Sequence, residues 1–219
     1  QREGDTPASP SNLRISAGTA RRRKLESPDV HLRPMMTKVR EALYSTLRSF
    51  ELFELPEVKV CDIFAGSGSV GLEAMSRGAT DVVFVDMAPN CIEVALRNAK
   101  TCGFEANARG VCARAENFLK DPARHGITDT PFSLVTITPP YEEVVYADLI
   151  RDVCASPLVG DDTLVVIEYP IEMGTLPPVL GDGKLLGLRN RRYGRTVLGV
   201  YISSPTGRLN AQIRPEEFM

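Results

Sequence analysis

The sequence lacks several features that mark particular classes of protein. Its 219 residues include no tryptophan, two histidines and five cysteines, and no pair of cysteines is spaced as C-x-x-C. This scarcity argues against a zinc site or a disulfide framework and favours a reducing compartment. No apolar run reaches the roughly 18 residues that span a bilayer. We therefore expect a soluble protein with no metal and no membrane partner.

The net charge is only −2, but the basic residues are unevenly distributed. Residues 13–40 hold eight Lys or Arg against two acids, and residues 189–195 hold four Arg and no acid. Either cluster alone is typical of a solvated surface. Together, in a chain that is otherwise acidic, they favour a surface that binds a polyanion, and nucleic acid is the commonest such partner.

Strand and helix patterns alternate with short connections after Pro56, which predicts an α/β fold with a mostly parallel sheet. Strand-like runs fall at residues 58–64, 81–86, 108–113, 132–137, 163–169, 184–194 and 195–203, and helical patterns separate the first five of them. The last two runs are expected to form an antiparallel hairpin with a turn near Tyr193-Gly194. The expected sheet is therefore seven-stranded and Rossmann-like.

The remaining sequence divides around this unit. We expect a disordered polar tail at residues 1–11 and an extension at 12–55, made of a hairpin turning at Gly18 and a helix from Thr37. The main α/β domain would cover 56–204, followed by a loose C-terminal tail at 205–219.

A glycine-rich loop follows the first strand of the main domain. Gly66-Ser67-Gly68-Ser69-Val70-Gly71 is a G-x-G-x-x-G pattern between a strand and a helix, where backbone can approach a ligand closely. The pattern alone also fits a dinucleotide dehydrogenase. Asp62, just before the loop, would repel a pyrophosphate but suit the cationic S-adenosylmethionine. Asp86 could accept hydrogen bonds from a ribose in either ligand, so the sequence favours S-adenosylmethionine over NAD.

The fourth strand of the main domain ends in an unusual corner, Thr138-Pro139-Pro140-Tyr141. Two prolines fix the backbone and cannot continue a strand. In a Rossmann-like sheet the ends of the first and fourth strands lie side by side at the point where ligands bind. The corner would then be a rigid floor beside the cofactor, with Tyr141 as a platform on which a planar base could stack.

Several of these stretches resemble one bacterial family, the RsmD-type enzymes that methylate the N2 amino group of a guanine in small-subunit (16S-type) ribosomal RNA. The resemblance covers roughly residues 13–203. It is carried by "LRISAGTARRRKL", "LRPMMTKVREALYSTL", "DIFAGSGSVGLEAMSRGA", "FVD", "TPPY" and "RRYGRTVLGVY". It implies a class I methyltransferase fold, S-adenosyl-L-methionine as cofactor, and rRNA or an assembling small subunit as partner.

The resemblance also implies roles for particular residues. The cofactor contacts would be Asp62, Phe64, Gly66, Ser67, Gly68, Asp86, Met87, Ala115 and Glu116. The catalytic corner would be Thr138, Pro139, Pro140 and Tyr141. The RNA contacts would be Arg21, Arg22, Arg23, Arg33 and Arg40, within the extension at 12–55, and we add Arg191, Arg192 and Arg195.

Two departures from the family pattern bear on activity. The family has Asp where this chain has Thr138, and Met35, Met36 and Thr37 replace its usual Thr, Thr and Asp. We expect Thr138 to keep the geometry with weaker polarisation of the target amine. The alternatives are an amino methyltransferase of the same fold acting on DNA adenine or protein amide nitrogen, or a weakened RNA-binding or ribosome-assembly factor.

The start of the sequence bears on its compartment. Bacterial-type rRNA occurs in bacteria and in organelles. The chain begins at Gln1 instead of Met, and its leading segment is polar. These features favour a processed plastid member of the family in the chloroplast stroma over a protein of the bacterial cytoplasm.

Overall fold

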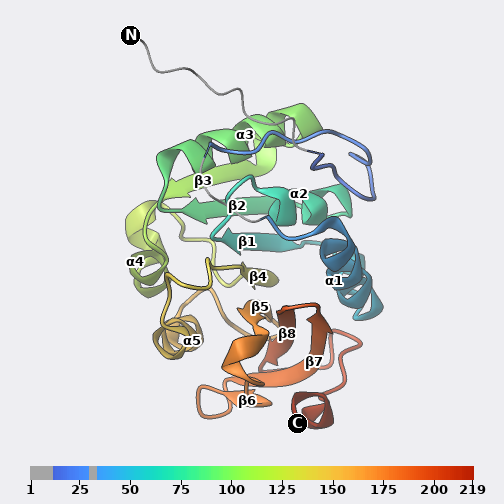
Figure 1. The fold of residues 1–219 in the computed structure, drawn as a ribbon, viewed down its shortest axis with the longest axis vertical. Coiled ribbons are helices and arrows are strands. Elements are labelled where there is room, and N and C mark those ends of the chain that lie inside the picture. The colour runs from blue at the N-terminus through green and yellow to red at the C-terminus, as the bar shows by residue number, and fades with distance from the viewer. Residues whose placement is uncertain (1–11, 30–33) are drawn as a thin grey trace.

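A computed structural model describes residues 12–29 and 34–219 and shows one sheet covered by helices on both faces (Figure 1). The strands are β1 Lys59–Ile63, β2 Asp81–Asp86, β3 Ala108–Cys112, β4 Leu134–Ile137, β5 Leu164–Pro170, β6 Val179–Leu180, β7 Leu185–Tyr193 and β8 Thr196–Ser203. The α-helices are α1 Thr37–Ser49, α2 Ser69–Ser76, α3 Pro89–Cys102, α4 Ala115–Lys120 and α5 Tyr146–Ala155. Short 3-10 helices are η1 Leu52–Glu54, η2 Glu105–Asn107, η3 Pro122–His125, η4 Ile171–Met173 and η5 Pro215–Phe218.

The strand order is β3-β2-β1-β4-β5-β8-β7-β6, and β1 to β5 run parallel. The predicted parallel sheet with a closing antiparallel hairpin is confirmed, because β8 pairs antiparallel with both β5 and β7. The expected count of seven strands is wrong by one. The extra strand, β6, has two residues and extends the edge of the sheet beside β7.

Alternation along the strands divides the core between the two faces of the sheet. Strands such as β1, β4 and β5 are apolar on both faces because helices cover both. Val60 and Leu134 point towards α1, α2 and α3, whereas Cys61 and Val135 point towards α4 and α5. No helix of the described residues has the length and apolarity that crossing a bilayer requires.

The N-terminal arm, defined here as residues 13–26, is a docked turn and not a regular hairpin. A single isolated antiparallel bridge joins Arg14 to Lys24. The apolar side chains of Leu13, Ile15 and Leu25 are buried in the core beneath α1, α2 and α3. The arm is therefore part of the folded domain, whereas its expected regular strands are absent from these described residues.

The C-terminal tail is packed, which corrects the expectation of a loose segment. Phe218 is buried, and its ring lies so close to Gly187 of β7 that a Cβ there would approach within 2.4 Å. The backbone N–H of Arg214 also donates to the carbonyl of Gly187, at 2.8 Å. The tail thus covers the outer end of the sheet.

Candidate active site

The two segments expected to meet at the ligand site lie side by side. Strands β1 and β4 are neighbours, with Ile63 opposite Ile137. Beyond them, the Thr138 N–H lies 3.4 Å from the carbonyl of Ile63, and the Thr138 hydroxyl lies 3.4 Å from the carbonyl of Phe64. This pair is the topological switch point of the sheet, because the strand order runs from β1 to β3 on one side and from β4 to β5 on the other. Ligands bind at this point in open α/β sheets. The predicted junction of glycine loop and proline corner is confirmed.

Close packing explains the glycines of the loop. Gly68 has a φ of +77°, and a Cβ there would lie 2.9 Å from the Cβ of Ala95 on α3. At Gly71 a Cβ would lie 2.8 Å from both Phe84 and Val82 on β2. The first of these glycines permits the turn, and the second lets α2 lie directly on the sheet.

Phe64 is the strained residue of this loop. It has a φ of +64°, a conformation that is costly for a residue with a bulky side chain. The turn carries the chain from β1 into the glycine loop while Phe64 stays half-buried. Strain of this kind persists only where surrounding structure enforces it, and it concentrates at ligand-binding sites.

Asp62 is a buried support of the loop. Its carboxylate is fully buried and accepts hydrogen bonds from the Gly71 N–H, at 2.9 Å, and from the Thr136 hydroxyl, at 2.9 Å. Burial raises the pKa of this carboxyl to about 7, although the two hydrogen bonds act in the opposite direction. Both oxygens accept from protein groups, so Asp62 supports the loop, and its predicted contact with a cofactor stays a prediction.

Asp86, by contrast, stands at the rim of the loop. One carboxylate oxygen accepts from the Gly66 N–H at 3.0 Å, and the other accepts from the Ala88 N–H at 2.9 Å. Each oxygen keeps a second lone pair that can accept from a ligand hydroxyl. Met87 follows with 57% of its surface exposed, so its side chain is accessible to a ligand.

Ser67 is buried within the loop, and two further predicted cofactor residues start α4, after the neighbouring strand β3. Ala115 is buried, whereas Glu116 is partly exposed and accepts from Arg114 at 2.6 Å. That hydrogen bond lowers the pKa of Glu116. Both residues lie at the same carboxyl edge of the sheet as Asp86, because β3 pairs in parallel with β2. Their contact with a cofactor stays a prediction.

The proline corner holds its tyrosine rigidly. The Tyr141 hydroxyl donates to the Glu168 carboxylate at 2.7 Å and lies 2.8 Å from the Thr196 hydroxyl. The chain reaches this point through Pro139, which is buried, and Pro140, which is half-buried. Tyr141 itself remains partly exposed, so its ring is fixed at one end without being enclosed.

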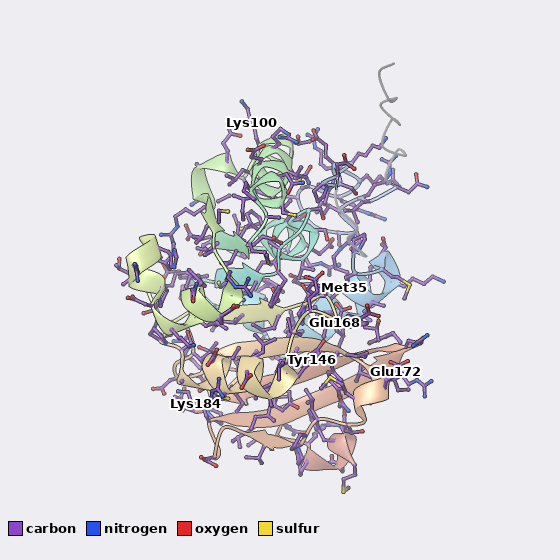
Figure 2. The ribbon with its side chains drawn as sticks, turned by 60° about the vertical axis from the view of Figure 1, so that its left-hand side comes forward. Met35, Lys100, Tyr146, Glu168, Glu172 and Lys184 are labelled. Atoms are coloured by element: carbon purple, nitrogen blue, oxygen red, sulfur yellow. The ribbon has the colours of Figure 1, made fainter. Side chains whose placement is uncertain are left out.

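Sequence reasoning missed Glu168 as part of this corner. It lies near the end of a buried strand of the parallel sheet, β5, and an acid in that position is a signal that could have identified it. The Tyr146 hydroxyl donates to the Glu168 carbonyl at 3.1 Å, and Figure 2 shows the two residues next to each other. Glu168 therefore connects the corner, β5 and α5.

The arginines predicted to contact RNA within residues 12–55 fall into two groups. Arg21, Arg22 and Arg23 are all exposed, and they remain candidates for RNA contact. Arg40 is not a candidate for RNA contact, because its side chain is fully buried and forms a 3.1 Å ion pair with Glu73 on α2. Charge alone could not distinguish a structural arginine from a binding one. Arg33 lies outside the described residues.

The arginines of the β7–β8 turn are exposed but differ in their partners. Arg191 pairs with Glu217 at 3.3 Å, and Arg195 pairs with Glu172. Arg192 donates to the Gly194 carbonyl at 2.8 Å and forms no salt bridge among the described residues. Of the three, Arg192 has the guanidinium most available to a phosphate.

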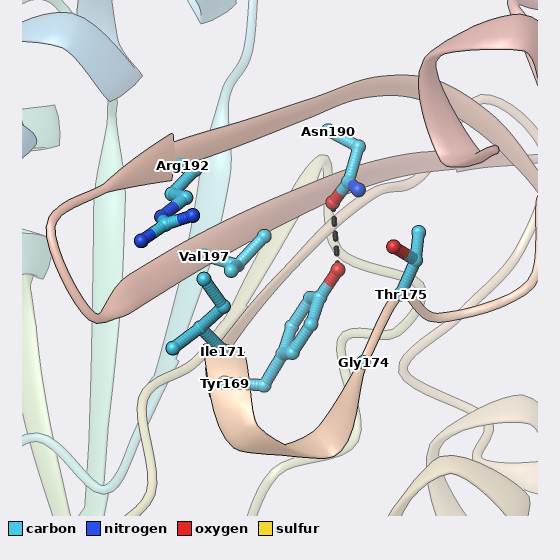
Figure 3. A pocket seen from close by; sticks show the side chains of 7 residues that line it. All are labelled: Tyr169, Ile171, Gly174, Thr175, Asn190, Arg192 and Val197. Carbon is cyan, nitrogen blue, oxygen red and sulfur yellow. Dashed lines mark hydrogen bonds between the residues drawn. The ribbon is translucent and has the colours of Figure 1, made fainter.

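Arg192 also lines a cavity of about 240 Å³ beside the turn (Figure 3). At its back the Tyr169 hydroxyl donates to the Asn190 side chain at 2.8 Å. Tyr169 and Val197 follow Glu168 and Thr196 directly, so they point to the opposite face of the sheet from Tyr141. The cavity is therefore separate from the junction of β1 and β4.

Comparison with known proteins agrees with this geometry. The family model described as Conserved hypothetical protein 95 matches residues 13–202. Ribosomal RNA small subunit methyltransferase D of Escherichia coli (strain K12) is 31% identical over 200 residues, which are 91% of this chain and 94% of that protein.

Solved structures share the same fold. Hypothetical protein TTHA0928 of Thermus thermophilus has a TM-score of 0.70 and 31% identity, and the match covers 86% of this chain and 98% of that one. The more distant SMU.776, complexed with SAH, has a TM-score of 0.54 and 17% identity over 73% of this chain and 49% of that one. At that identity only the fold is shared.

Proposed function

This chain belongs to the Conserved hypothetical protein 95 family, of RsmD type, and we propose that it methylates small-subunit rRNA with S-adenosylmethionine as methyl donor. We propose further that the acceptor is the N2 amino group of a guanine. The observation that carries the proposal is the contact of Thr138 with Phe64, which joins the glycine loop to the proline corner in one site.

The residues at this site fit the cofactor. Asp86 offers acceptor oxygens at the rim of the loop, next to the exposed side chain of Met87. A carboxylate in this position can accept hydrogen bonds from the hydroxyls of a ribose. Asp86 and Met87 would hold the ribose and adenine, with Ala115 and Glu116 beside them. When bound, S-adenosylmethionine supplies a methyl group activated by a positively charged sulfur.

The chain's own residues would orient the base. The Thr138 hydroxyl and the Pro139 carbonyl can each accept a hydrogen bond from an N–H of the exocyclic amine. These two bonds would turn the lone pair of the amine nitrogen towards the methyl donor. Tyr141 would stack on the ring, a contact worth about 1–3 kcal/mol per base. The amine proton leaves after the new bond forms, so positioning matters more than a strong base.

Two exposed basic surfaces would bind the RNA backbone. Arg21, Arg22 and Arg23 project from the N-terminal arm, and Arg192 projects from the β7–β8 turn. A target guanine within folded RNA must leave its stack, at a cost of a few kcal/mol. Phosphate contacts at the two surfaces would offset this cost and make binding strongly dependent on salt.

Mass spectrometry of rRNA nucleosides from cells lacking the protein tests the proposal. We expect N2-methylguanosine to disappear from one position of the small-subunit rRNA and to return when the gene is restored. A restored copy with Tyr141→Ala is the control for activity at the corner. An unchanged N2-methylguanosine content would refute this function. Fractionation of the same cells would place the activity in a compartment that contains bacterial-type ribosomes, for which we propose the plastid stroma.

A further inference from the structure

Asn98 on α3 joins the N-terminal arm to the glycine loop. Its side chain is 1% exposed, although the amide is polar at both ends. The amide nitrogen donates to the carbonyl of Ser67 in the loop, at 2.9 Å, and to the carbonyl of Glu26 in the arm, at 3.0 Å. The amide oxygen accepts the Glu26 N–H at 2.8 Å. Both of its donors and its acceptor oxygen are therefore used to hold two segments that are remote in sequence.

The arm is also clamped to α2, the helix that begins at the glycine loop. The Glu73 carboxylate accepts from the N–H groups of Ser16 and Ala17, at 3.0 and 3.2 Å, and from the Ser16 hydroxyl, at 2.5 Å. Burial disfavours its charge, but these bonds and the nearby Arg40 outweigh that effect and lower the pKa of Glu73. An ionised, fully buried carboxylate thus fixes the arm to α2.

Shape reinforces this clamp. Gly18 at the tip of the arm has a φ of +82°, and a Cβ there would lie 1.7 Å from the carbonyl oxygen of Ser76 at the end of α2. The Ser76 hydroxyl donates to the carbonyl of Ala17 and accepts the N–H of Ala20. Figure 1 shows the arm lying across α2 and α3. The arm can neither slide nor lift without breaking these contacts.

The opposite side of the arm faces solvent and carries positive charge. Arg21, Arg22, Arg23 and Lys24 are exposed there, whereas Leu25 is buried among apolar side chains. A polyanion that binds these side chains more tightly when the arm is docked would favour the docked state, and the docked arm also holds the loop. Any such coupling is reciprocal by thermodynamic necessity.

We propose that Asn98 is a positioning residue through which RNA binding on the arm and cofactor binding on the glycine loop strengthen each other. The inference rests on the proposed function, and it adds a pathway: RNA on the arm fixes the Glu26 backbone, Asn98 fixes the Ser67 carbonyl, and Gly66 is held where it meets Asp86. Couplings between sites are typically about 5- to 150-fold in affinity.

The test measures the affinity for S-adenosylhomocysteine by calorimetry, with and without an unmodified transcript of bacterial small-subunit rRNA. In the unchanged protein we expect the RNA to tighten binding at least about fivefold. With Asn98→Ala the ratio of the affinity measured with RNA to the affinity measured without RNA should fall close to one. The matched control is Asn107→Ala, because Asn107 is exposed and lies at the end of η2, away from the arm and the loop. A merely structural role for Asn98 would lower the melting temperature and both affinities while leaving the ratio unchanged, which would overturn the proposal.

A second variant separates the arm from α2 without altering the loop. Gly18→Ala should also bring this ratio of affinities close to one. Gly126→Ala is the control and should leave the ratio unchanged, because Gly126 has a similar φ of +79° and a Cβ there would have no neighbour within 4 Å. Should the variants fail to fold, hydrogen exchange of residues 66–71 in the unchanged protein decides. We expect RNA to slow that exchange in the presence of S-adenosylhomocysteine, and unchanged exchange would overturn the proposal.

Failure of the coupling and failure of the function give different results. If the unchanged protein binds S-adenosylhomocysteine and methylates RNA, but RNA leaves the cofactor affinity unchanged, only the coupling is refuted. If coupling persists in both Asn98→Ala and Gly18→Ala, Asn98 is not its carrier. If the protein binds no S-adenosylhomocysteine at all, the proposed function and the coupling fall together.

Discussion

Replacing Thr138 by Asp should increase the rate of methyl transfer about fivefold. A neutral hydrogen bond contributes about 1 kcal/mol, and a bond to a charged acceptor contributes roughly twice as much. The change removes the contact of the Thr138 hydroxyl with the Phe64 carbonyl, but at 3.4 Å that bond is too long to contribute much. The net gain in the transition state is therefore about 1 kcal/mol, and about 1.4 kcal/mol corresponds to a tenfold rate.

Single-turnover transfer of labelled methyl from S-adenosylmethionine to small-subunit rRNA measures this effect. Thr138→Asn is the matched control, because it has the shape of Asp without the charge and should give little or no gain. Thr138→Ala removes the acceptor and should slow transfer. If Asn accelerates the reaction as much as Asp, shape and not charge limits the rate; if Asp slows it, the assigned role of position 138 is wrong.

Three further predictions follow from the described contacts. Asp86→Asn should weaken S-adenosylhomocysteine binding by about 10-fold or more in calorimetry. Asp81→Asn, at the other end of β2, is the control and should leave the affinity unchanged. Equal affinities of the two variants would contradict the proposal that Asp86 binds the ligand. Arg40→Leu removes one of the two arginines that pair with the buried Glu73 and leaves the other, Arg77, at 3.0 Å, so urea unfolding should show a loss of about 1–3 kcal/mol. The salt slope of RNA binding should meanwhile stay unchanged, and a slope reduced by about one would instead show that Arg40 contacts phosphate. Burial raises the folded-state pKa of Asp62 to about 7 from an ordinary 3.8. Stability relative to Asp62→Asn should therefore fall between about pH 4 and about pH 7, by up to about 1.4 kcal/mol per pH unit, and a pH-independent difference would refute this.

The central part of the fold was predictable because its signals are local. The apolar runs of β1, β2, β4 and β5, the glycine loop after β1 and the helices between them can each be identified from a short window of sequence. The parallel order then places the loop beside the corner at 138–141, because short right-handed connections leave few arrangements open. The same short-range patterns identified the antiparallel β7–β8 pair.

What sequence could not supply depended on contacts between distant segments. Arg40 resembles its basic neighbours until its partner Glu73, 33 positions away, is seen to be buried with it. The support of Tyr141 by Glu168 and Thr196 spans 27 and 55 positions. The partners of Asp62 are also distant in sequence, because its carboxylate accepts from the Gly71 N–H, 9 positions away, and from the Thr136 hydroxyl, 74 positions away.

The most direct measurement of the central claim is transfer of labelled methyl from S-adenosylmethionine to an unmodified small-subunit rRNA transcript by the purified protein. The RNA would then be digested and its nucleosides separated. The account predicts label in N2-methylguanosine with the unchanged protein and a large loss of label with Tyr141→Ala. Absence of label in RNA, or label in another nucleoside, would contradict it.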